Sequence, residues 1–325
     1  MSATLLWESI HQLLDDKGGP PLGDLGAALG AAAAGILVEM NQCQLPLLAS
    51  TGKEELLPFT RQALDNLAPL GRVLMLAPPP RAFQCSPAQL KPGVGIHRVA
   101  AAQVVAQLLR GGIHTIDGPI EAEGLLQTIL QVVLAHPTSS PMQSLCLRIL
   151  RASLNSPAPG LWLPLVECSS GDCENPPLQA TLSKLASDAL GVPVGKRSEI
   201  TGFALAAAKL LKNTASGTAS GDAEGLMFEA KLDEQEEGAQ SNTTTIRPDA
   251  REELRQWLEA DPTWTAFVKP GGAMEELIAQ QEGDLCGPRP AIGAGLESYS
   301  SLTPMDSQAL LQHLQSMSAG FSDQG

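Results

Sequence analysis

Three apolar segments with helical spacing follow one another between Gly95 and Leu154, and they limit the fold more than any other feature of this sequence. Within each segment, apolar residues recur at every third or fourth position, as they do on one face of an α-helix. Each helix is too short to bury that face by itself, so the three must pack against one another. The residues expected to face inward are Val99, Ala102, Ala106, Leu109, Leu125, Ile129, Val132, Met142, Leu145, Ile149 and Ala152.

Glycine and proline separate these segments. Gly111 and Gly112 follow the first pattern, as glycines do past the end of a helix. Pro137 ends the second pattern because its ring disfavours helical backbone in the preceding residue, and Pro157 follows the third. Helices alternating with short breaks are typical of an α-solenoid or an irregular bundle. Since no strict repeat period is visible, the solenoid would be of the degenerate HEAT or armadillo kind.

The composition favours helices over sheets. Leucine and alanine are abundant, and aromatic residues make up only 3% of the chain. A β-sandwich or barrel needs alternating β-branched and aromatic residues, which this sequence lacks. The 325 residues are enough for two domains, but a stack of helices can run that long as one unit. We therefore predict an all-α protein, an irregular HEAT- or armadillo-like α-solenoid with a disordered acidic loop.

The chain divides by composition into four parts. Residues 1–212 are predicted to form a helical-repeat-like body. Residues 213–248 are small, polar and acidic, which is typical of a flexible loop that cannot bury enough apolar area to fold. Residues 249–291 are a C-terminal helical segment of the same domain, and residues 292–325 are a low-complexity tail with a candidate terminal helix. Further helices are expected at 4–15, 24–38, 54–70, 178–189 and 198–212, with 72–76 either a short strand or another helical turn.

The charge of the chain restricts its partners. The formal net charge of −14 repels nucleic acid and anionic membranes, and the sequence shows no local cluster of Lys and Arg that would reverse it. No apolar run approaches the roughly 20 residues of a membrane span. The nearest, Gly23–Met40, is mostly alanine and glycine, so we expect a closely packed helix there. We predict neither a nucleic-acid partner nor a membrane span.

Patterns for catalysis and metal binding are sparse. The chain has five histidines, and its glycine-rich stretches lack the lysine or acidic residue of a phosphate site. Cys168 and Cys173 have no second pair or histidine nearby, which argues against zinc. Because no secretory signal is apparent, the six cysteines are expected to be reduced thiols of a cytoplasmic or nuclear protein. We predict no catalytic residue, no cofactor and no metal.

Several blocks between residues 93 and 291 carry a resemblance to a known family. They are Gly93–Leu109 with its histidine-arginine start, EGLL at 123–126, AHPTSSPMQSL at 135–145, SEITGFALAAAKLL at 198–211, and LEADPTWTAFV followed by DLCGPRPA. In this order they resemble the SAPS-domain family, the regulatory subunits of protein phosphatase 6 and of its yeast relatives. The plant-like members are the most similar, through Trp264 and the Cys286–Pro290 element.

This resemblance implies a non-catalytic regulatory or scaffold subunit, shorter at its N-terminus than a typical member. It would bind a phosphatase 6-type catalytic subunit and direct its choice of substrate, and the catalytic metals would belong to that partner. The candidate partner contacts are His97, Arg98, Trp257, Trp264 and Arg289. His97 is expected to be a capping or surface residue, and the two tryptophans to be core anchors unless they are exposed. Two alternatives stay open: an armadillo-like adaptor unrelated to phosphatases and, from another class, a small-molecule enzyme.

Overall fold

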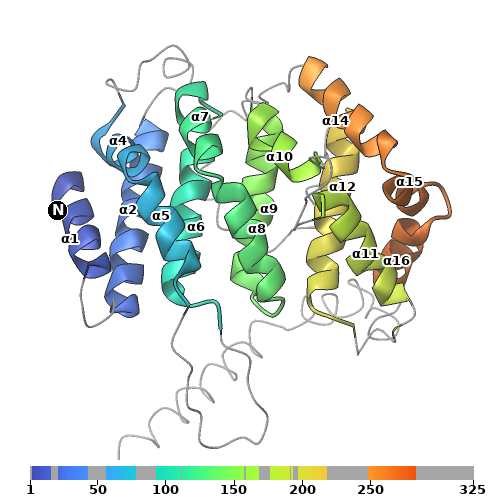
Figure 1. The fold of residues 1–325 in the computed structure, drawn as a ribbon, viewed down its shortest axis with the longest axis horizontal. Helices are drawn as coiled ribbons and strands as arrows, with labels where there is room; N and C mark the ends of the chain where they lie inside the picture. Colours follow the sequence, from blue (N-terminus) through green and yellow to red (C-terminus); the bar gives the residue numbers. More distant parts are fainter. Residues whose placement is uncertain are drawn as a thin grey trace, which may run out of the picture. The chain divides into compact units, whose positions relative to one another are not determined.

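The computed structural model describes most of the first 217 residues and a C-terminal helical segment. The described ranges are 2–15, 21–42, 56–77, 93–110, 112–156, 159–167, 176–190, 192, 197–217 and 248–282. These ranges contain helices and no strand, which confirms the prediction of an all-α protein (Figure 1). The chain divides into two compact units, Met1–Glu275 and Glu276–Gly325, and of the second only the helical residues up to Glu282 are described.

The helices in chain order are α1 (Ala3–Leu14), α2 (Leu22–Gln42), α4 (Pro58–Asp65), α5 (Leu67–Met75), α6 (Ile96–Leu109), α7 (His114–Ala122), α8 (Leu125–Ala135), α9 (Ser140–Asn155), a 3-10 turn (Pro159–Leu161), α10 (Leu163–Val166), α11 (Leu178–Leu190), α12 (Ile200–Ser216), α14 (Pro248–Ala260), α15 (Pro262–Val268) and α16 (Ala273–Glu282).

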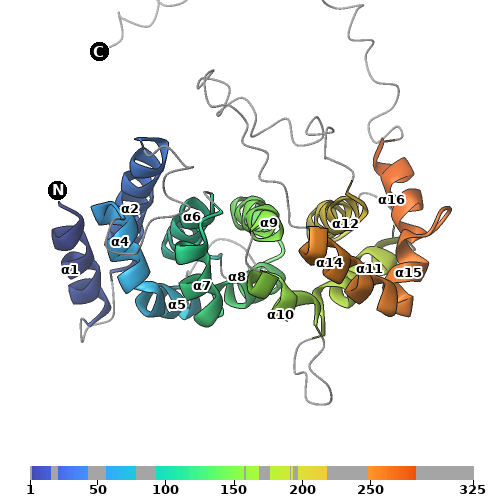
Figure 2. The same ribbon diagram turned by 90° about the horizontal axis from the view of Figure 1, so that it is seen from above.

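Within the first unit the longer helices lie in two layers (Figure 2). In the first layer α2 packs on α6, α6 on α9, and α9 on α12. In the second layer α5 packs on α8, while α5, α8 and α11 contact α6, α9 and α12 of the first layer. Neighbouring helices therefore bury the apolar faces that the spacing predicts, because no single helix could do so alone.

The predicted helix over 54–70 is in fact two helices, and proline is the reason. Helix α4 ends before Asn66, and α5 begins after it. Pro69 has no amide hydrogen, and its ring would collide with the carbonyl of residue 65 if α4 continued. The chain therefore turns at Asn66 and starts a new helix with Pro69 in its first turn. Residues 72–76, for which strand and helix were both open, are helical up to Met75.

Helices α7, α10 and α16 were not predicted, and the predicted end of the helix at 198–212 was wrong. Helix α7 contains Gly118 and Pro119, residues that hide a helical pattern, and α16 was not recognised. Helix α12 runs to Ser216, so the polar residues 213–216, which we assigned to the acidic loop, belong to a helix. Residues 218–247 of that loop, the element GDLCGPRPA and the candidate helix at 306–317 lie outside the described residues.

Helix α2 meets α6 through a glycine. A Cβ atom on Gly26 would lie 2.8 Å from Cγ2 of Ile96 and 3.2 Å from the backbone nitrogen of His97. Such distances are shorter than ordinary van der Waals contact, so only glycine allows the two helices to come this close. Next to this contact α2 buries Leu25, Leu29 and Ile36 completely. The prediction of a closely packed, small-residue helix is confirmed for this face.

A carboxylate of α2 also fixes the start of α4. Glu39 is buried, and its Oε1 accepts a hydrogen bond from the Phe59 backbone nitrogen at 2.8 Å. Its Oε2 accepts from the Thr60 backbone nitrogen at 2.8 Å and from the Thr60 hydroxyl at 2.9 Å. The residue before α4, Leu57, has no side chain that could cap these amides. Glu39 therefore replaces a local cap and joins α2 to α4.

By length and composition alone, Leu22–Asn41 of α2 could cross a membrane. This corrects the expectation that no apolar run approaches such a length. A core helix and an N-terminal signal sequence pass the same test, so it is weak evidence for a span. The contacts of α2 with α1, α4 and α6 account for its apolar face within the fold.

We predict that Gly26→Ala lowers the free energy of unfolding, whereas Gly30→Ala in the same helix raises it. Both substitutions favour the helical backbone, but a Cβ on Gly30 meets nothing within 4 Å, while one on Gly26 overlaps α6. The two variants should differ by about 2 kcal/mol in chemical denaturation. Equal stability of the two variants would show that α2 and α6 are not in close contact.

Candidate functional site

Helix α6 lies at the centre of the first unit. Eleven of its 14 residues are buried, and it contacts α2, α5, α7 and α9. A helix that is apolar on nearly all sides is stable only when other elements surround it. Three of its buried residues are nevertheless polar: Gln107 near its end, and His97 and Arg98 in its first turn.

His97 and Arg98 connect α6 to the ends of two other helices. Nε2 of His97 lies 2.9 Å from the carbonyl oxygen of Leu76, and Nη2 of Arg98 donates to the carbonyl oxygen of Met75 at 3.2 Å. Nη1 of Arg98 lies 2.9 Å from Nε2 of His136, the residue that ends α8. Unbonded carbonyls at a helix end need donors, and these side chains supply them at the end of α5. We call His97, Arg98 and His136 the buried polar cluster.

Arg98 determines which role the facing nitrogen of His136 has in their hydrogen bond. A guanidinium can only donate, so Nε2 of His136 must accept and cannot carry a proton. Burial lowers the pKa of His97, the hydrogen bond to Leu76 opposes this, and the charge of Arg98 lowers it further. Burial also lowers the pKa of Arg98. Burial thus opposes the charged form of both His97 and Arg98.

The turn before α6 makes room for the His97 ring. Gly95 has φ of 85°, in the region that favours glycine, and a Cβ there would lie 2.5 Å from Cε1 of His97. The ring folds back against this backbone and is completely buried. Of the two roles expected for His97, the surface role is wrong because the side chain is buried. The capping role holds, but at the end of α5 and not at the start of α6.

The predicted partner contacts are mostly interior residues. His97, Arg98 and Trp264 are buried, so in this structure they have almost no surface to offer a partner. Trp257 is half-buried on α14, and Arg289 lies outside the described residues. Trp264 instead packs against Phe267 with ring centroids 6.0 Å apart, as expected of a core anchor. Contact of any of these five residues with a partner stays a prediction.

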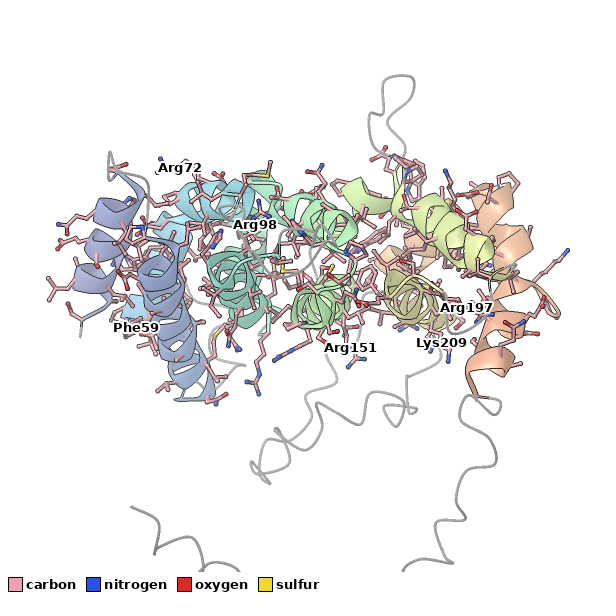
Figure 3. All side chains as sticks on the ribbon, turned by 90° about the horizontal axis from the view of Figure 1, so that it is seen from below. Phe59, Arg72, Arg98, Arg151, Arg197 and Lys209 are labelled. Atoms are coloured by element: carbon pink, nitrogen blue, oxygen red, sulfur yellow. The ribbon has the colours of Figure 1, made fainter. Side chains whose placement is uncertain are left out.

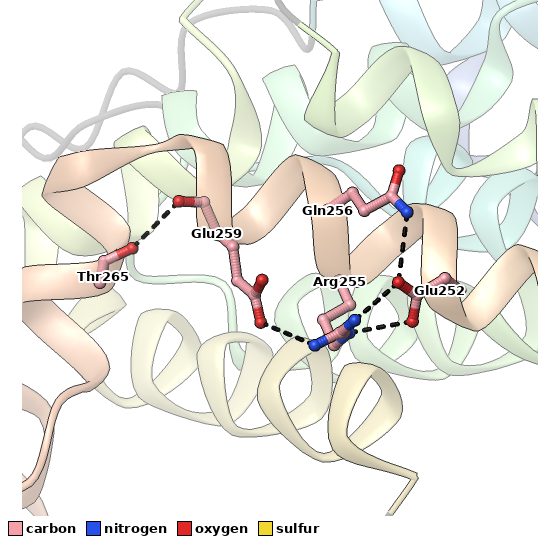
Figure 4. A network of polar contacts seen from close by, with 5 residues as sticks. All are labelled: Glu252, Arg255, Gln256, Glu259 and Thr265. Atoms are coloured by element: carbon pink, nitrogen blue, oxygen red, sulfur yellow. Dashed lines mark hydrogen bonds and ion pairs between the residues drawn. The ribbon is translucent and has the colours of Figure 1, made fainter.

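The solvent side of α14 carries a small polar network (Figure 4). Arg255 pairs with Glu252 at 2.6 Å and with Glu259 at 3.3 Å, and Gln256 donates to Glu252 at 3.2 Å. The hydrogen bond from Arg255 is the main reason that the pKa of Glu252 is lowered. Because all these groups are exposed, the network contributes little to stability and does not resemble a reaction centre.

A second group of charges lies on the outside of the first layer. Arg110 follows the last residue of α6, Arg148 and Arg151 lie on α9, Lys209 lies on α12, and all four are exposed. Figure 3 shows Arg151 and Lys209 on the same side of this layer, with Arg72 of α5 at the opposite edge. We call Arg110, Arg148, Arg151 and Lys209 the basic face.

The basic face is unusual because no acidic residue belongs to its helices. The sequences of α6, α9 and α12 contain no aspartate or glutamate, and the nearest acid in the chain is Glu199, which precedes α12. Arg110, Arg148 and Arg151 form no ion pair or side-chain hydrogen bond with any other residue in the described part of the chain. The sequence shows no local cluster of Lys and Arg, and these four cations come together only in that their helices α6, α9 and α12 pack side by side.

Two observations concern metal ligands and thiols among the described residues. Within the described ranges no three His, Cys, Asp or Glu side chains come together as metal ligands would. Cys146 of α9 is completely enclosed, and burial raises the pKa of its thiol to about 12. A thiol in that state is not a nucleophile at neutral pH. The other five cysteines lie outside the described residues.

Comparison with known protein families, with curated proteins and with solved structures finds no match to this chain.

We predict that stability falls as the pH drops below about 6.5, in part because of His97. Its pKa is lower in the folded state than in the unfolded state, so the unfolded chain binds the extra proton first. The stabilisation by neutral His97 is therefore complete above the pKa that His97 has in the unfolded chain. It is lost as the pH falls toward the lower pKa that His97 has in the folded protein. Replacing His97 by glutamine should lower stability at pH 8 and flatten the change between pH 8 and pH 5 in denaturant titrations. If the free energy of unfolding changed with pH in the same way for wild type and His97→Gln, this role of His97 would be contradicted.

Proposed function

We propose that this chain is a non-catalytic scaffold subunit that binds a protein partner through the outer surface of its first helix layer. The observation that carries the proposal is the basic face. It spans three packed helices in a chain whose net charge is −14. Exposed arginines that no acid in the described ranges neutralises can pair with an approaching anionic group, and arginine is enriched at protein interfaces.

The layered arrangement supports a repeat-like scaffold as the finer fold assignment. Helices α6, α9 and α12 each pack against a second-layer helix, α5, α8 and α11 respectively. Paired helices that stack side by side are the building principle of HEAT and armadillo proteins, which use extended surfaces for binding. We therefore propose an irregular α-solenoid of this kind for the first unit.

We propose a protein serine/threonine phosphatase catalytic subunit of the phosphatase 6 type as the partner, in the cytoplasm or the nucleus. The resemblance to the SAPS-domain family supports this choice. Three of its blocks, at 93–109, 135–145 and 198–211, fall on α6, on the start of α9 and on α12. These are the helices that carry the basic face. The scaffold would position the catalytic subunit and so direct its choice of substrate.

The proposal is tested by mixing the purified full-length chain with a purified phosphatase 6-type catalytic subunit from the same organism. The two proteins should co-elute in size-exclusion chromatography at a constant ratio, and serum albumin, an acidic protein of another class, should elute separately. Separate elution of the phosphatase would overturn the phosphatase assignment. It would leave an adaptor unrelated to phosphatases as the better account.

A further inference from the structure

Three helices of the first layer, α6, α9 and α12, carry charged side chains of one sign only. The helices α6, α9 and α12 together contain Arg98, Arg148, Arg151, Lys209 and Lys212, with no acidic residue among them. Arg98 is buried in the polar cluster, and Lys212 reaches the Val268 carbonyl at 3.5 Å. Among the described residues Arg148 and Arg151 have no such partner, so no described acid neutralises the charge at the centre of this surface.

The spacing of these cations matches an extended chain. Arg148 and Arg151 are three residues apart on α9 and so project from one helix face. Lys209 lies on the neighbouring helix α12 and Arg110 at the end of the neighbouring helix α6. Packed helices are about 8–10 Å apart, so the basic face covers about 20 Å. An extended polypeptide advances about 3.3 Å per residue and crosses that distance in six or seven residues.

Carboxylates on a polypeptide fit this surface better than a nucleic acid does. The whole chain is strongly acidic, so a polyanion longer than the basic face would be repelled beyond it. Proteins that bind single-stranded nucleic acid also stack bases on aromatic side chains. The only Phe, Tyr or Trp in α6, α9 and α12 is Phe203, which is buried. A short acidic segment needs only the guanidinium and ammonium groups that are present.

We infer that the basic face is a docking site for an extended acidic segment of a protein partner, about seven residues long, whose carboxylates pair with Arg148 and Arg151 on α9. The inference rests on the proposed scaffold function and names the chemistry that the partner presents. Lys209 and Arg110 extend the site on either side of the two arginines.

The test uses the full-length protein and a fluorescein-labelled peptide of eight alternating glutamate and serine residues. Its affinity is measured by fluorescence anisotropy in low-salt buffer. Wild-type protein should bind this peptide and not the same peptide with glutamine in place of glutamate. The double variant Arg148→Glu/Arg151→Glu should bind about tenfold more weakly or worse, because two attractive pairs become repulsive.

The matched control is Arg72→Glu/Lys184→Glu. Both residues are exposed and lie on α5 and α11 of the second layer, and the variant changes the net charge by the same amount. It should alter the affinity less than about twofold at moderate salt, where distant charges are screened. If Arg148→Glu/Arg151→Glu proves unstable, Arg148→Gln/Arg151→Gln replaces it, with a weakening of about threefold or more expected.

Three results would overturn the inference. The first is that the glutamate peptide does not bind, and the second is that both charge-reversal variants lose the same amount of affinity for it. The third is that a single-stranded oligonucleotide of equal charge binds more tightly than the peptide at the same arginines. The last result would identify a nucleic-acid surface instead. If the phosphatase co-elutes with wild type and with Arg148→Glu/Arg151→Glu alike, and the peptide does not bind, the scaffold function stands and the docking surface fails.

Discussion

The burial of α6 between its neighbours is the constraint on which the first unit depends. Its side chains contact α2 on one side, α9 on the other, and α5 and α7. The close approach of α2 at Gly26 and the enclosed His97 ring at Gly95 both require glycine at the edges of this helix. Helix α9 packs on α6, and α12 packs on α9. The positions of the exposed cations on α9 and α12 therefore depend on the position of α6.

The polar groups that fix α6 are inside the fold, and the charges that a partner could meet are outside it. The buried polar cluster bonds the carbonyls at the end of α5 and reaches His136 at the end of α8, so it determines where second-layer helices lie against the first layer. The arginines of α9 instead point outward and take no part in the core. The structural role thus falls to the buried cation Arg98, and the binding role that we propose falls to the exposed arginines of the same helix layer. Reversing the charge of an exposed arginine should leave the core intact.

Periodicity in the sequence predicted most of the helices, because apolar residues at every third or fourth position reflect burial on one side. It failed at α7, where Gly118 and Pro119 interrupt the pattern, and at Asn66, where Pro69 splits one expected helix into two. Periodicity could not predict the basic face. Arg110, Arg151 and Lys209 are dozens of residues apart in the chain, and only the packing of α6, α9 and α12 brings them to one surface. The polar character of His97 and Arg98 suggested exposure, although their bonds to helix-end carbonyls allow them to be buried.

The central claim, that α6 is the buried core helix on which this surface is built, is tested most directly by native-state hydrogen exchange read by mass spectrometry. Peptides covering Val99–Leu109 should exchange only through global unfolding, with an opening free energy equal to that from chemical denaturation, while peptides from α1 and α14 open earlier. Exchange of Val99–Leu109 at a lower free energy than α1 would contradict the claim, because a helix that opens first cannot determine the positions of its neighbours.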